Sequence, residues 1–358
     1  MKIYKLLLII LFVEQLFSLP RYAIVRGGKC SDCHFNPTGG LLRNEDGFNW
    51  AKNNLGLMKT KGSVSQNLNE NVVFGLDFRF QYLYSQELNK ADFHKMAGGI
   101  YLGINLDEDI KFLTKYDIYR GYFEAYGILL NLLPFDGYIK IGTFLPDFGI
   151  RIDDHTSYTR GGDGGLLSKK NSQGLVFEPG YSQTGVELKF EPLDQVSFTF
   201  SVGQDKTPFM RDPSYISKIE FNPSITEFNI LVGTSYGSFQ KISTPYRLVS
   251  VFGGFGIHRF SLLSEIVFAQ NFFNVDQNSR AFMTELAYRI KTGFDVISRI
   301  DYSVPDLKEN NQYFSHLILG LDVSPYPFIK LKPQVRFNLE KPLEKNNNSF
   351  VLQFHFWY

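Results

Sequence analysis

Two cysteines and a histidine near the start of the chain are its most chemically specific feature. Cys30 and Cys33 are the only cysteines among the 358 residues, and His34 follows the second one directly. A Cys-x-x-Cys-His run is the attachment signature of a c-type haem. The spacing places both thiols on one side of a helical turn, where they can add to the two haem vinyl groups, and it presents the imidazole to the iron. We therefore predict one covalent haem c, held by Cys30, Cys33 and His34 as the proximal iron ligand.

Two other uses of the cysteine pair stay open at this point. A Cys-x-x-Cys pair can be a redox disulfide, but that chemistry expects a thioredoxin-like strand-to-helix context, which the flanking residues lack. It can also be half of a zinc site, but the sequence has no second cysteine pair to complete four ligands. The haem hypothesis explains the adjacent histidine, and the other two do not.

Further residues are candidates for completing the haem site. Arg43 is a candidate partner for a haem propionate, although a surface arginine is commonly just solvated. The distal iron ligand is expected to be His355, Met58 or His155, or the position is open. A thioether from Met58 would raise the reduction potential relative to a second histidine. Ordinary roles compete with each of these, because a histidine in a polar interior often only meets water.

The first residues resemble a secretory signal peptide. Two lysines precede an apolar run over residues 6–13, and Ser18 lies near a plausible cleavage point. The apolar run is too short for a membrane-spanning helix, which needs about 20 residues. We predict a signal peptide at residues 1–18 and a monohaem segment at 19–70, which is too short to bury a haem by itself. The net charge of +1, with no basic patch, argues against a nucleic-acid partner.

Strict alternation begins at Asn71. Every even position from Val72 to Tyr84 is apolar or aromatic, whereas odd positions include Asp77 and Arg79, and residues 350–358 alternate in the same way. This is typical of strands with one apolar and one polar face. A soluble β-sandwich also alternates. Segments of roughly ten residues, abundant Tyr and Phe, and connections that alternate between tight and long favour a membrane barrel instead.

The turns predict a transmembrane barrel over residues 71–358. Threading the chain through them gives an all-β fold, an antiparallel transmembrane β-barrel of roughly 16 strands with a short N-terminal haem-binding segment. Short turns then fall on the periplasmic side, and they include one at residues 222–226. The longest connection, Leu145 to Ser182, is the third outer loop. Either it folds into the lumen and narrows it, or it is a surface loop packed on itself with salt bridges to Arg151 and Arg160.

A signal peptide, one Cys-x-x-Cys-His motif and a barrel to the C-terminus together resemble the fused monohaem cytochrome–porins. The resemblance covers the architecture, but only Cys30, Cys33 and His34 are specific in sequence. It implies an outer-membrane protein of a diderm bacterium, with the haem segment at the periplasmic mouth or in the lumen. Some members of that family take electrons from ferrous iron. The stretch from Asn36 to Asn44 is not one that we associate with those members.

We therefore expect electron transfer at the outer membrane, in the manner of an oxidoreductase of the iron-oxidising cytochrome–porin type. A lone haem is much shorter than the hydrocarbon layer of about 30 Å, so a periplasmic electron carrier such as a soluble cytochrome is implied, together with a donor from outside. The alternative is a solute porin in which the haem segment is a structural or sensory plug. The sequence does not indicate the oligomeric state, and the expected surroundings are outer-membrane lipid.

Overall fold

The fold is given by a computed structural model of the chain. It describes residues 20–151, 156–162, 174–175, 181–204, 213–225, 227–239, 244–309, 311–342 and 346–358. The predicted signal peptide at residues 1–18 and the candidate ligand His155 lie outside the described residues.

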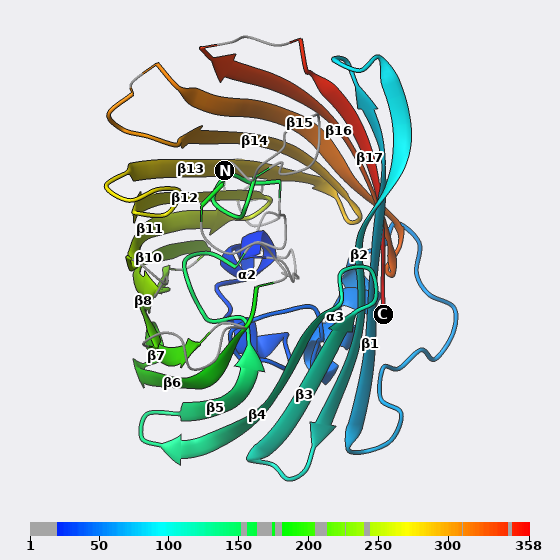
Figure 1. The fold of residues 1–358 in the computed structure, drawn as a ribbon. Coiled ribbons are helices and arrows are strands. Elements are labelled where there is room, and N and C mark those ends of the chain that lie inside the picture. The colour runs from blue at the N-terminus through cyan, green and yellow to red at the C-terminus, as the bar shows by residue number, and fades with distance from the viewer. Residues whose placement is uncertain are drawn as a thin grey trace, which may run out of the picture.

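Antiparallel strands make up most of the described chain (Figure 1). Their bounds are β1 Val72–Ser85, β2 Lys90–Asn105, β3 Ile110–Asp117, β4 Tyr122–Leu133, β5 Gly137–Phe144, β6 Gln183–Leu193, β7 Val196–Gln204, β8 Ser214–Phe221, β9 Ser224–Ile225, β10 Phe228–Phe239, β11 Tyr246–Ile257, β12 Phe260–Gln270, β13 Asn278–Lys291, β14 Phe294–Val304, β15 Tyr313–Tyr326, β16 Ile329–Lys341 and β17 Ser349–Trp357.

These strands close into a barrel of 16 positions. Both β8 and β9 pair with β10, so they are one strand that is interrupted at Pro223, a residue that cannot donate a ladder hydrogen bond. The first and last strands close the ring, because β1 pairs with β17 from Asp77 opposite Trp357 to Ser85 opposite Ser349. The predicted all-β fold and strand number are confirmed.

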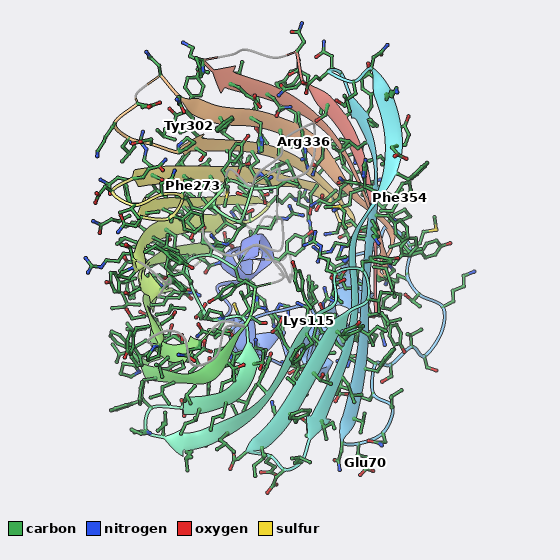
Figure 2. The ribbon with its side chains drawn as sticks, in the orientation of Figure 1. Glu70, Lys115, Phe273, Tyr302, Arg336 and Phe354 are labelled. Atoms are coloured by element: carbon green, nitrogen blue, oxygen red, sulfur yellow. The ribbon has the colours of Figure 1, made fainter. Side chains whose placement is uncertain are left out.

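The two faces of the barrel wall have opposite chemistry. In β1, Asp77 and Gln81 are each 1% exposed on the inside, while the apolar even positions face outward, as the alternation predicted. Figure 2 shows Lys115 on the lumen side and Phe354 on the outer side. Large outward-facing residues, including Phe200 and Leu319, are more than 40% exposed. Each Å² of their apolar surface would cost about 25 cal/mol if it faced water. A closed barrel with this apolar outer surface belongs in lipid, and the predicted outer-membrane location is confirmed. Among the described residues, no helix is long and apolar enough to cross a membrane.

The connections follow the predicted asymmetry, with one correction. Turns at one end of the barrel are short, such as those after Asn105 and Lys291, and the longest connection follows β5 at the other end. The predicted tight turn at residues 222–226 is wrong in position. The chain continues there as β9, in which Ile225 pairs with Phe228 of β10, because Pro223 interrupts the ladder without ending the strand.

The helices before β1 lie within the ring of strands, and residues 20–54 form a plug (Figure 1). It contains the helix α2, Pro20–Arg26, the 3₁₀ turn η2, Cys30–Asp32, and the helix α3, Glu45–Asn54. Helix α2 packs against β10, β11 and β12. A second contact is apolar: Phe48 and Trp50 of α3 share a buried cluster with Tyr22 and with Trp357 of the last strand. The packing of α2 and the apolar cluster around α3 therefore both hold the plug against the wall.

The described part of the third outer loop also lies inside the barrel. The Gly149 amide donates to Ser235 Oγ of β10 at 2.9 Å, and Ser157 Oγ donates to Asp301 of β14 at 2.5 Å. Arg160 pairs with Glu265 of β12 at 2.9 Å. For these described residues the prediction that the loop folds into the lumen is confirmed, and the alternative of a surface loop is wrong. The carboxylates on the inner wall supply the partners that keep it inside.

Candidate functional site

Residues 30–34 form a single helical turn, as their spacing predicts. The backbone amides of Cys33 and His34 donate to the Cys30 carbonyl at 3.2 and 3.0 Å. The Lys29 amide donates to Asp32 Oδ2 at 2.9 Å, which closes the start of the turn. The two thiols form no disulfide; Cys30 is exposed, whereas Cys33 is buried and its sulfur accepts from Arg26 at 3.6 Å. The described residues contain no cluster of three His, Cys, Asp or Glu side chains that could hold a metal ion.

Asn44, at the start of helix α3, fixes the position of the cysteine turn. The Asn44 amide donates to the Cys33 carbonyl at 3.2 Å, and the Asn44 side chain caps α3 by accepting from the Gly47 amide at 2.8 Å. This contact leaves no room for a side chain at Gly47, because a Cβ there would lie 2.0 Å from the Cys33 carbonyl oxygen. The glycine is thus required by the close approach of the helix to the cysteine turn.

Two cavities flank the turn. The larger, of about 170 Å³, is lined by Cys30, Cys33, His34, Arg43 and His355 among others. The smaller, of about 80 Å³, also reaches Cys30. The structure therefore brings five of the seven predicted site residues to one cavity, although they lie at opposite ends of the sequence.

His34 is poised to act as a neutral ligand. Burial, together with the positive charges of Arg43 and Arg151, lowers its pKa to about 3. Its Nδ1 atom is buried and has no hydrogen-bond partner in the described part of the chain. A neutral imidazole is the form that binds a metal, and a buried ring nitrogen without a partner is costly. The two thiols, which form no disulfide, and this imidazole therefore fit a c-type haem in donor chemistry.

Arg43 presents a positive charge to the same cavity. Its guanidinium lies over the Trp357 ring at 3.8 Å, and the side chain is buried. Burial lowers its pKa to about 10, despite the opposing influence of Asp77. Arg43 remains a cation at neutral pH, as its predicted role beside a propionate requires.

The structure separates the candidate distal ligands. His355 lines the cavity, and its Nε2 atom lies 2.7 Å from Asp77 Oδ1. Met58 is 52% exposed, and its amide donates to the Pro325 carbonyl at the rim of the barrel, away from the residues that line the cavity. His355 is thus the described candidate that is placed beside the cysteine turn.

Sequence reasoning missed Arg151 as a site residue. This residue of the third loop lines both cavities beside Cys30, and its Nη1 approaches the Thr38 carbonyl of the plug at 3.5 Å. Its positive charge also acts on His34. Only the inward fold of the loop brings it there, so no local pattern could have identified it.

A buried ion pair joins the plug, the wall and the third loop. Lys140 of β5 and Glu187 of β6 are fully buried, with Nζ and Oε1 2.5 Å apart. Lys140 also donates to Thr38 of the plug at 3.0 Å, and Glu187 accepts from the Asp147 amide of the loop at 3.1 Å. Tyr138 adds a third donor to Glu187 at 3.0 Å. The Lys140–Glu187 pair therefore joins the plug, through Lys140, to the third loop, through Glu187.

Comparison with solved structures shows the fold. No family model and no curated protein matches the chain. Outer-membrane OmpT of Vibrio cholerae superimposes with a TM-score of 0.55 at 11% identity, covering 80% of this chain and 97% of that one. The anion-selective porin from Comamonas acidovorans gives 0.58 at 9% identity, covering 80% and 98%. The outer membrane channel DcaP of Acinetobacter baumannii gives 0.57 at 10%, covering 82% and 100%. The chain therefore has the 16-strand antiparallel barrel fold of porins and outer-membrane channels.

Proposed function

We propose that this porin-like barrel carries one covalent haem c in its lumen and transfers electrons at the outer membrane. The observation that carries the proposal is the Cys30–His34 turn: two thiols that form no disulfide and an imidazole with a lowered pKa line one lumen cavity. Cys30 and Cys33 would hold the haem by thioether bonds, and His34 would be the proximal ligand. Arg43 would neutralise a propionate, and His355 is the described candidate for the distal side. When bound, the haem supplies one-electron redox chemistry.

The chain's own residues support such a site. Helix α3 holds the turn through Asn44, and the imidazole Nδ1 of His34 is buried in the lumen. The positive charges of Arg43 and Arg151 favour the neutral imidazole and would stabilise an electron added to the haem. A periplasmic electron carrier remains part of the proposal, because one haem cannot span a layer of about 30 Å.

A denaturing gel stained for haem tests the attachment. Changing Cys30 and Cys33 together to serine should abolish the stain and the pyridine haemochrome spectrum, while Ser31→Ala, between them, should keep both. The purified wild-type protein should also exchange electrons with a small redox mediator. Haem retained in the double variant, or a haem-free wild-type protein after expression with a c-type maturation system, would overturn the proposal.

The second candidate is a solute porin in which the N-terminal segment is a structural or sensory plug. The structural comparisons favour it over electron transfer, because the neighbours whose function is named are porins or channels. Conductance in planar bilayers separates the two. A solute porin should conduct ions in the wild-type form and show no redox turnover, whereas an electron-transfer protein should show turnover whether or not it conducts.

A further inference from the structure

The larger cavity is lined mainly by cations. Among the described residues, nine arginine and lysine side chains line it, against two carboxylates, Asp32 and Glu285. The cations come from every part of the molecule. Arg26 and Arg43 belong to the plug, Arg151 to the third loop, and Arg79, Arg299 and Lys332 to the wall.

Within the described residues, the carboxylates that pair with this lining do not balance it. Asp322 is shared by Arg21, Lys330 and Lys332, and Asp77 contacts both Arg79 and His355. Arg21 also pairs with Glu285 and Asp295, Arg299 with Asp301, and Lys29 with Glu191. Two of these carboxylates are shared with a further cation, Asp295 with Arg289 and Glu191 with Lys189. With Asp32 included, seven carboxylates therefore face eleven cations in the part of the chain that the structure describes.

The plug adds positive charge without bringing an equal number of carboxylates. Arg26 donates to the Cys33 sulfur at 3.6 Å. The two propionates of one haem would offset only part of this surplus.

We propose that this cavity is a binding chamber for small anions, and that the small redox partner reaching it is an anion, such as a metal–carboxylate chelate. The first half of the proposal needs no haem; the second half rests on the proposed function. A low-dielectric chamber lined by one sign of charge raises the local concentration of ions of the opposite sign, by tenfold or more at low salt. Aqueous ferrous iron, a dication, would be depleted there by the same physics.

Thiol labelling measures the charge preference without haem. Gln353 lines the cavity from β17, so Gln353→Cys in a Cys30→Ser, Cys33→Ser background places one thiol there. The modification rate of this thiol is measured with an anionic reagent, sulfonatoethyl methanethiosulfonate, and with a cationic one, trimethylammonioethyl methanethiosulfonate. Each rate is divided by the rate of the same reagent at an exposed reference thiol, Ser63→Cys. The normalised anion-to-cation ratio should be about ten or more at low salt and should fall as salt rises. Adding Arg151→Gln should lower it several-fold, whereas Lys90→Gln on the exposed start of β2 should leave it unchanged.

A ratio of one or less at residue 353 would overturn the anion chamber, whatever the haem content. Folding of each variant is checked by heat-modifiable migration on a gel. If the haem-free background does not fold, Gln353→Cys alone in the haem-loaded protein serves instead, because thioether bonds then block the other cysteines. If thiol 353 prefers anions but the wild-type protein carries no haem after expression with a c-type maturation system, the proposed function is refuted and the anion chamber is supported.

Discussion

Replacing Lys140 by methionine tests whether the Lys140–Glu187 ion pair is shielded from water and stabilises the folded protein. Both side chains of the pair are fully buried, so the substitution leaves Glu187 charged with only two neutral donors, the Tyr138 hydroxyl and the Asp147 amide. Removing one partner of a buried ion pair costs about 3–5 kcal/mol. Neutralising the other member as well, in Lys140→Met with Glu187→Gln, removes the uncompensated charge. Tyr138 and the Asp147 amide donate to different oxygens of Glu187, so the single amide oxygen of the glutamine keeps an acceptor for only one of them. We expect the double variant to lose only about 2 kcal/mol, from this hydrogen bond and from the one between Lys140 and Thr38.

The assay is equilibrium unfolding of the detergent-refolded barrel in guanidinium, followed by the fluorescence of Trp50 and Trp357, the two tryptophans of the chain. The free energy of unfolding is compared for the wild type, both single variants and the double variant. Lys90→Met, at an exposed lysine, is the control and should change stability by less than about 0.5 kcal/mol. A cost below about 1 kcal/mol for Lys140→Met, or a double variant as unstable as the sum of the singles, would mean that water reaches Glu187.

Three further outcomes are expected. The haem-free protein should lose stability as the pH falls from about 6.5 towards 3, because the unfolded chain then protonates His34 while the folded chain keeps it neutral. The melting temperatures of the wild type and of His34→Gln, plotted against pH, should therefore diverge only below pH 6.5. Parallel plots would contradict the burial of the ring. In the haem-loaded protein, His355→Ala should change the ferric absorption spectrum and Met58→Ala should not, since only the former lines the cavity; a spectrum sensitive to Met58 alone would reverse the assignment. Arg160→Ala removes the ion-pair partner of the buried Glu265 and should lower the free energy of unfolding by about 3–5 kcal/mol. It should also speed chymotrypsin cleavage of the third loop. An unchanged cleavage rate would show that other contacts hold the loop.

The predictable and unpredictable parts of this structure differ in the range of the interactions that determine them. Alternation in β1 predicts the barrel, because in a strand each side chain's face follows from its position alone. The Cys30–His34 turn is likewise local, so its spacing predicts its shape. Arg151 and the Lys140–Glu187 pair could not be predicted, because their roles arise when a loop, a plug and the wall meet in one lumen. Met58 is close to the cysteines in sequence but is held at the rim by the β15–β16 turn, so sequence proximity was misleading there.

The contact between Trp357 and the plug has a consequence for assembly. Trp357 is the second-last residue of the chain, yet it supports Arg43 and belongs to the apolar cluster of Phe48 and Tyr22. The N-terminal segment is made first, but the surface that receives it is complete only when the last strand has paired with the first. We therefore expect the plug to dock late, together with barrel closure. A mutation at the extreme C-terminus would then leave the cysteine turn, more than 300 residues away, without its final support.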